Sequence, residues 1–207
     1  ILLITIPATM GLVVLAEPIV EVAFERGEFD AVATYMTSRA LVFYSLGLVG
    51  MSLRTLLDRV YYSLQDTKTP MLNGSFSVVL NIILNLVLIR FLAHGGLALA
   101  TSIAVTIATI LMFYGLKKKI GPLGIMSYLK CGLKAALASA IMGVVAYLVY
   151  HGLYNALGVS KLYNLVSLLA AVGTGVVVYG LLCYLFAIEE VRLIVEKVRE
   201  RIAGMRV

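Results

Sequence analysis

Two arginines lie within a segment of the chain that is otherwise mostly apolar. Arg39 and Arg54 are separated mainly by Leu, Val, Gly, Ser and aromatic residues. A guanidinium keeps its charge in a protein, so each arginine must reach a membrane interface or face a hydrated cavity. In a cavity, it would serve as a bidentate donor to a phosphate or another anionic headgroup. Arg39 lies nearer the end of its segment, which favours Arg54 as the cavity residue and leaves both interpretations open.

Two asparagines and a threonine form a second polar group. Asn81 and Asn85 are four residues apart and share one face of a helix, and Thr101 follows early in the next apolar segment. Their oxygens are of the type that coordinates a small cation, and their hydrogen-bonding groups are also of the type that joins neighbouring membrane helices. The spacing by itself favours the interhelical hydrogen bonds.

Glutamates recur near the end of the first apolar segment. Their spacing of four, four and three residues places Glu17, Glu21, Glu25 and Glu28 on one helical face, and Pro18 removes an amide donor between the first two. Such a stripe would attract cations or carry protons if it were buried. Because one crossing takes about 20 residues, a water-exposed position at the membrane surface is favoured.

Residue combinations typical of enzymes are missing from the sequence. His94 and His151 have no Glu or Cys neighbours that would form a metal site or a nucleophile pair, and there is no P-loop glycine motif. Cys131 and Cys183 do not form a CxxC pair, and their predicted depths make them poorly placed for a disulfide. The sequence therefore predicts a protein that is not an enzyme.

These polar residues are carried by an unusually apolar chain. Of 207 residues, 61% are hydrophobic and 14% are charged, which no ordinary soluble domain resembles. Apolar runs near 20 residues, the length of one helical crossing, recur between short polar joints. An all-α, polytopic membrane protein is predicted, with six transmembrane helices at about 1–24, 32–56, 71–92, 97–116, 131–150 and 162–188.

Lysine and arginine are concentrated in alternate joints, which predicts the orientation. The joint at 117–134 and the C-terminal residues are expected in the cytoplasm, as is the N-terminal end. The net charge of +6 then reflects membrane topology and anionic headgroups, and no nucleic-acid partner is implied.

The tail at 189–207 carries an apolar stripe typical of an amphipathic helix on the membrane surface, or of a charged extension of the sixth helix. Since Ile1 opens within an apolar run, we interpret the chain as an internal fragment.

The joint between the second and third segments resembles a known signature. It reads Arg59-Val60-Tyr61-Tyr62-Ser63-Leu64-Gln65-Asp66-Thr67-Lys68-Thr69-Pro70, which is similar to the signature loop of the MurJ (MviN) lipid II flippases. The loop residues that carry the resemblance most directly are Arg59, Asp66, Lys68, Thr69 and Pro70. The similarity extends along the chain, is strongest over about the first hundred residues, and covers the last six of the family's fourteen helices.

The resemblance implies a MATE-like fold of two lobes, within the multidrug/oligosaccharidyl-lipid/polysaccharide exporter superfamily. Residues 1–120 would form four helices of the second lobe, and 121–188 two additional helices with a groove for the polyprenyl tail. The implied activity is alternating-access transfer of lipid II, or another polyprenyl-diphosphate lipid, across a bacterial inner membrane. A related exporter and a non-transporting membrane scaffold remain as alternatives.

The resemblance also implies a candidate sodium site and no other cofactor. By position, its ligands fall on Asn81, Asn85, the Leu97 carbonyl and Thr101. The sodium-binding pattern of the family has a carboxylate where this chain has Asn85. Because hard cations favour anionic oxygens, a neutral hydrogen-bonded clamp between the two helices is the competing prediction.

Overall fold

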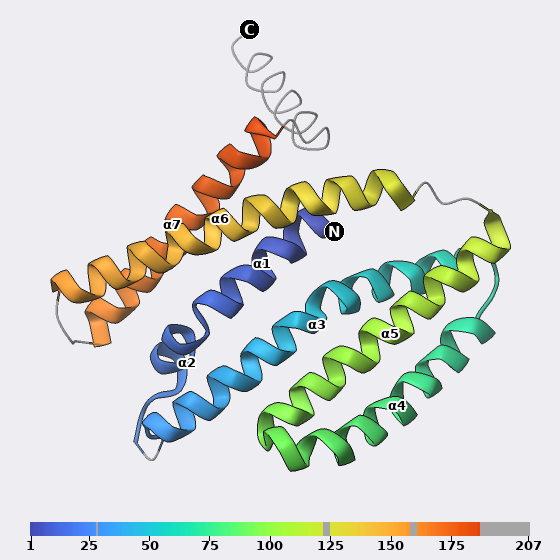
Figure 1. Ribbon diagram of the computed structural model, residues 1–207, viewed down its shortest axis with the longest axis horizontal. Coiled ribbons are helices and arrows are strands. Elements are labelled where there is room, and N and C mark those ends of the chain that lie inside the picture. Colours follow the sequence, from blue (N-terminus) through green and yellow to red (C-terminus); the bar gives the residue numbers. More distant parts are fainter. Residues whose placement is uncertain (28, 122–124, 158–160, 187–207) are drawn as a thin grey trace, which may run out of the picture.

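The computed structural model describes residues 1–186 except 28, 122–124 and 158–160. All regular structure in this part of the chain is helical, which confirms the all-α prediction (Figure 1). Five helices are long and apolar enough to cross a membrane, and a bent pair makes up to six crossings. The helices are α1 (Leu2–Val14), α2 (Ala16–Phe24), α3 (Ala31–Ser63), α4 (Lys68–Leu92), α5 (His94–Ile120), α6 (Ile125–Leu157) and α7 (Lys161–Leu185).

The first expected crossing is broken in the middle. α1 ends at Val14 and α2 begins at Ala16, and the two helix axes are bent by 73° at the buried Leu15. Pro18 explains the break, because its ring clashes with the carbonyl of Val14 and it has no amide hydrogen to donate to that carbonyl. The first segment is therefore a bent pair of helices, whereas the hydropathy pattern predicted one continuous helix.

A second proline inside α1 creates a contact with α7. Pro7 cannot donate the helical hydrogen bond to the carbonyl of Leu3. The hydroxyl of Tyr179 on α7 donates to that carbonyl instead, at 2.8 Å. The free backbone acceptor left by the proline thus ties α1 to α7.

Helix α5 lies between α3 and α4, with little contact between those two (Figure 1). Glycines allow the close approach of α3: a Cβ atom on Gly47 would lie 2.6 Å from the Ser102 hydroxyl oxygen. That hydroxyl donates to the carbonyl of Phe43 at 2.6 Å, and Thr109 donates to the carbonyl of Gly50 at 3.0 Å. Hydroxyl-to-backbone bonds over small residues are typical of packing between membrane helices.

Helices α6 and α7 form a hairpin that is attached to the rest through α1 and α2. Met10 and Val14 of α1 lie over Gly143 of α6, and no described residue of the hairpin packs against α3, α4 or α5. Cys131 and Cys183 form no disulfide among the described residues and lie in one apolar cluster, although the sequence placed them at different depths. The predicted amphipathic helix at 189–207 lies outside the described residues.

Candidate functional site

The predicted polar group on α4 and α5 forms one chain of hydrogen bonds. Asn85 donates through its side-chain amide to the Asn81 oxygen at 3.0 Å, and Asn81 donates to the Thr101 hydroxyl oxygen at 3.1 Å. Thr101 in turn donates to the carbonyl of Leu97 at 3.0 Å. All four residues named from the sequence are therefore brought together at the α4–α5 contact. We call these four residues the amide clamp.

One hydrogen-bond acceptor of the amide clamp has no donor among the described residues. The side-chain oxygen of Asn85 is buried and accepts no hydrogen bond within the described part of the chain. The oxygens of Asn81, Asn85, Thr101 and Leu97 belong to the class that hard cations take, and none of them is anionic. Nor do the described residues contain a cluster of three or more His, Cys, Asp or Glu side chains that could hold a metal ion. These residues suit a neutral clamp, and they would supply the uncharged part of a cation site.

The signature loop is built around the carboxylate of Asp66. It accepts hydrogen bonds from the Thr69 hydroxyl and, at 3.0 Å, from the Thr69 amide, and it forms an ion pair with Lys119 at the end of α5. The hydrogen bond from Lys119, followed by those from Thr69, holds the pKa of the Asp66 carboxyl well below its usual range. Asp66 therefore joins the start of α4 to the end of α5.

The backbone turn that precedes Asp66 ends α3. Gln65 adopts a positive φ of 58°, and its amide bonds back to the carbonyl of Tyr62 at 3.0 Å. The Asp66 amide bonds to the carbonyl of Tyr61, also at 3.0 Å. These two bonds are the Schellman pattern that closes a helix end, here with glutamine where glycine is usual. The turn points the Asp66 carboxylate toward the first turn of α4.

Tyr61 anchors the same loop from within α3, and sequence reasoning did not single it out. Its ring is fully buried, and its hydroxyl donates to the carbonyl of Met112 at 2.9 Å. The ammonium of Lys119 lies 5.6 Å from the ring centroid. A Cβ atom on Gly115 would lie 2.8 Å from the Tyr61 hydroxyl oxygen, so the glycine makes room for the ring. In the loop itself, Arg59 and Lys68 are exposed and Pro70 is buried in the first turn of α4.

Arg54 lies against α4. One of its guanidinium nitrogens is 3.2 Å from the position that a Cβ atom would take on Gly74. The neighbouring Asn73 has a buried side-chain oxygen that accepts no hydrogen bond among the described residues. The cavity predicted for Arg54 is not one of the two pockets described next, since neither is lined by it.

Arg39 lines a pocket at the break between α1 and α2. The pocket has a volume of about 280 Å³, and its charged and hydroxyl-bearing lining residues are Glu17, Tyr35, Ser38 and Arg39. The Arg39 guanidinium carbon lies 5.7 Å from the centroid of the Tyr35 ring, and one nitrogen donates to the Tyr35 hydroxyl at 3.5 Å. Arg39 is thus held at the side of this pocket.

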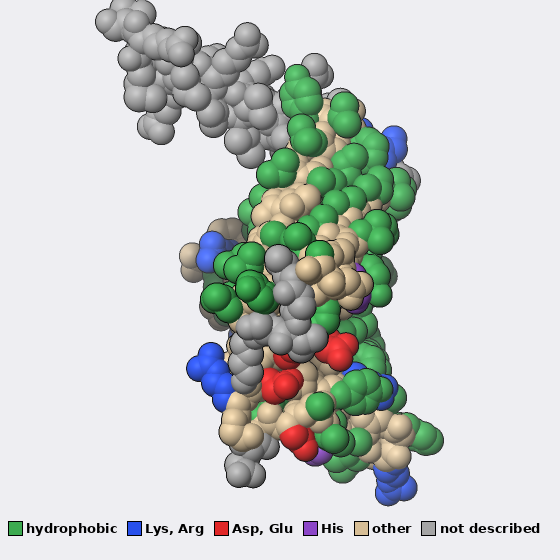
Figure 2. Space-filling view, turned by 90° about the vertical axis from the view of Figure 1, so that its left-hand side faces the viewer, with side chains coloured by type: hydrophobic (Ala, Val, Ile, Leu, Met, Phe, Trp, Pro, Cys, Tyr) green, Lys and Arg blue, Asp and Glu red, His purple; other side chains and the backbone are tan. Residues whose placement is uncertain are grey.

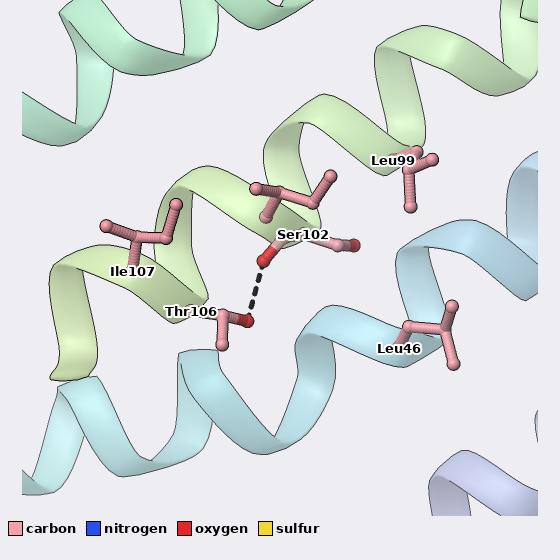
Figure 3. Close-up of a pocket in the computed structure, with 6 residues that line it drawn as sticks. Leu46, Leu99, Ser102, Thr106 and Ile107 are labelled. Carbon is pink, nitrogen blue, oxygen red and sulfur yellow. Dashed lines mark hydrogen bonds between the residues drawn. The ribbon is translucent and has the colours of Figure 1, made fainter.

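A second pocket, between α3 and α5, is almost entirely apolar (Figure 3). Its volume is about 230 Å³, and its apolar lining includes Leu46, Leu99 and Ile107. Its two hydroxyl-bearing residues use their oxygens within the protein: Thr106 donates to the Ser102 carbonyl at 2.7 Å, and Ser102 donates to Phe43. The pocket therefore offers apolar surface and no free charge.

The glutamate stripe lies at the end of the molecule opposite the signature loop. Figure 2 looks onto this end and shows acidic side chains gathered there. Glu17 is exposed and Glu21 is half-buried, and Glu25 accepts a hydrogen bond from Thr34 at 3.0 Å. These observations agree with the water-exposed interpretation of the stripe. Glu28 lies outside the described residues.

Comparison with known proteins gives one consistent result. The sequence profile of the family described as "Lipid II flippase MurJ" matches residues 1–169. A "Probable lipid II flippase MurJ" of Bdellovibrio bacteriovorus is 34% identical over 89% of this chain and 35% of its own length. One of Vibrio cholerae is 43% identical over 54% of this chain and 21% of its own length.

A solved structure is also similar. The protein described as "Lipid II flippase MurJ, inward closed conformation" superposes with a TM-score of 0.74 at 30% identity, covering 92% of this chain and 37% of that one. The chain thus spans between about a fifth and little more than a third of the length of these relatives. The profile match extends over more than half of the chain and includes the α3–α4 loop and the amide clamp. The chain therefore belongs to the MurJ lipid II flippase family.

Proposed function

We propose that this chain is the C-terminal portion of a transporter that moves lipid II from the cytoplasmic to the outer leaflet. The observation that carries the proposal is the family match over residues 1–169. The uncovered apolar surface of α4, where Pro70 and Ser77 are the buried residues, suits a helix in contact with lipid or with further helices. Alternating access between two lobes, with helices preceding this chain forming the first lobe, belongs to the same proposal.

In this proposal, α1–α5 are part of the second lobe and α6–α7 are the two additional helices. Within the described part of the chain, α6 and α7 contact α1 and α2 and none of α3, α4 and α5, which supports treating the hairpin as a separate unit. Its many exposed apolar side chains would suit a polyprenyl tail as well as ordinary lipid acyl chains. Arg54 would serve the headgroup, since a guanidinium is a bidentate donor to phosphate oxygens.

The cellular experiment uses the full-length protein encoded by the native gene, in a strain with no other lipid II flippase. Depletion should stop lipid II from reaching the outer leaflet, and the wild-type gene should restore it. An Arg54→Ala variant should restore transport only weakly, at normal protein level and unfolding temperature, with Arg90→Ala as the exposed arginine control. Normal lipid II transport after depletion would contradict the proposal.

Sodium binding by the full-length protein is a separate proposal about the amide clamp. Transport measured with and without sodium, at a fixed membrane potential, distinguishes the two predicted roles. A sodium-dependent rate that Asn81→Ala abolishes would support the ion site. A rate independent of sodium would contradict it and leave the amide clamp as a hydrogen-bonded contact between α4 and α5.

A further inference from the structure

The pocket at the helix break combines charges of opposite sign on apolar walls. Glu17 enters from α2, Arg39 enters from α3, and Val13, Val42 and Phe43 supply apolar surface. Both charged side chains are exposed to solvent. The ion pair found among the described residues, Lys119 with Asp66, lies at the other end of the molecule, so the two charges in the pocket do not neutralise each other directly.

The helix break adds further polarity to the wall of the pocket. α1 ends at Val14, and Val14 borders the pocket. Because Pro18 has no amide hydrogen, it cannot bond to the Val14 carbonyl, which is left without its usual helical donor beside the Glu17 carboxylate. The α1–α2 side of the pocket therefore favours a cationic group. The α3 side, with the Arg39 guanidinium, favours an anionic group.

A ligand with a single charge would match one wall and be repelled by the other. A free phosphate would meet the Glu17 carboxylate, and a simple cation would meet the Arg39 guanidinium. A ligand that carries both an ammonium and a phosphate would match both walls. The charges of the pocket thus select a zwitterionic group.

The depth of the pocket fits a lipid headgroup. Arg39 and Arg54 are fifteen residues apart on the same helix, which corresponds to about 22 Å along its axis. Centred in a hydrocarbon layer of about 30 Å, the two guanidiniums lie close to opposite interfaces. Arg39 is then at headgroup level, and Val42 and Phe43 lie on the side toward the membrane centre, where acyl chains begin.

We propose that this pocket binds a phospholipid whose headgroup carries a primary ammonium and a phosphate, as in phosphatidylethanolamine. Glu17 and the carbonyl end of α1 would accept from the ammonium, while Arg39 would donate to the phosphate. This lipid would be a bound component of the protein and is distinct from the transported lipid, so the inference does not rest on the proposed function.

The test uses the purified, delipidated full-length protein in detergent. Its unfolding temperature is measured while phosphatidylethanolamine or phosphatidylglycerol of identical acyl chains is added. Glu17→Gln and Arg39→Gln are compared with the wild type. Glu21→Gln, on the same helix but outside the pocket lining, and Arg90→Gln, an exposed arginine at the end of α4, are the matched controls.

Phosphatidylethanolamine should stabilise the wild type and both controls more than phosphatidylglycerol does. Glu17→Gln should remove this preference, and Arg39→Gln should weaken the response to both lipids, each by about tenfold in apparent affinity, as expected when a hydrogen bond to a charged group is lost. If Arg39→Gln does not fold, the Glu17→Gln comparison decides alone. Equal stabilisation of the wild type by both lipids, or an unchanged preference in Glu17→Gln, would overturn the proposal.

Discussion

The carboxylate of Asp66 shows how a short motif acquires its role from a distant residue. The motif itself predicts that Asp66 and Thr69 meet, because they are three residues apart at the start of a helix. Lys119, 53 residues further along, completes the site, and only the packing of α5 against α3 brings it there. Tyr61 escaped prediction for the same reason, since its partner is a backbone carbonyl of α5.

The ion pair predicts a pH dependence with a defined sign. The pKa of Asp66 is lowered in the folded protein, so its contribution to stability is fully present above the unfolded value near 4. That contribution is lost as the pH falls from there toward the lowered folded value. Asp66→Asn should therefore lower the unfolding temperature at pH 7, and the difference from the wild type should shrink below about pH 4. Asp58→Asn is the control, because Asp58 forms no ion pair within the described part of the chain. A pH-independent difference would contradict the role of the charge.

At the scale of helices, two prolines account for what hydropathy did not predict. Hydropathy and length identified the apolar segments well, because the ability of a helix to cross the hydrocarbon layer depends mainly on its length and composition. They cannot report a bend, because a broken helix and a straight one have the same composition. The sequence shows that Pro18 removes one amide donor from the helix. The helix axis changes direction by 73° at Leu15 because the proline ring clashes with the Val14 carbonyl.

The structural effect of Pro7 can be tested through a single hydrogen bond, the one from the Tyr179 hydroxyl to the Leu3 carbonyl. Tyr179→Phe should destabilise the protein by about 1 kcal/mol, since the Leu3 carbonyl loses its donor. In a Pro7→Ala background, residue 7 regains an amide hydrogen for that carbonyl, so the cost of Tyr179→Phe should fall. Denaturant unfolding of the four variants measures this coupling, with Tyr184→Phe, an exposed tyrosine on the same helix, as the control. Equal costs in both backgrounds would contradict the explanation.

At the scale of the whole molecule, the charges divide between two ends. The signature loop and Lys117 to Lys119 lie at one end of the molecule. The glutamate stripe and the pocket at the break between α1 and α2 lie at the other end. By the positive-inside rule, we expect the lysine-rich end in the cytoplasm. A single cysteine introduced at Lys118, in a variant with Cys131 and Cys183 replaced, should resist an impermeant reagent added to intact cells. A cysteine introduced at exposed Arg26 should react, and the reverse pattern would contradict the orientation.

Family membership was predictable from the loop residues, since a motif can be read without knowing what surrounds it. The interhelical contact of Asn81 and Thr101 was also predictable, because both lie on helices joined by a short turn. The pocket at the break between α1 and α2 could not be predicted from the sequence, since it depends on the direction that α2 takes after Leu15. Hydropathy likewise gave no sign that α6 and α7 attach only through α1 and α2 among the described residues.

Movement of lipid II across a membrane by the full-length protein can be measured without other cell components. The most direct measurement reconstitutes it in vesicles with labelled lipid II confined to one leaflet and follows the label's appearance in the other. We expect protein-dependent transfer that is strongly reduced by Arg54→Ala and unaffected by Arg90→Ala. Transfer no faster than in protein-free vesicles, from a protein that unfolds cooperatively and has inserted fully, would contradict it.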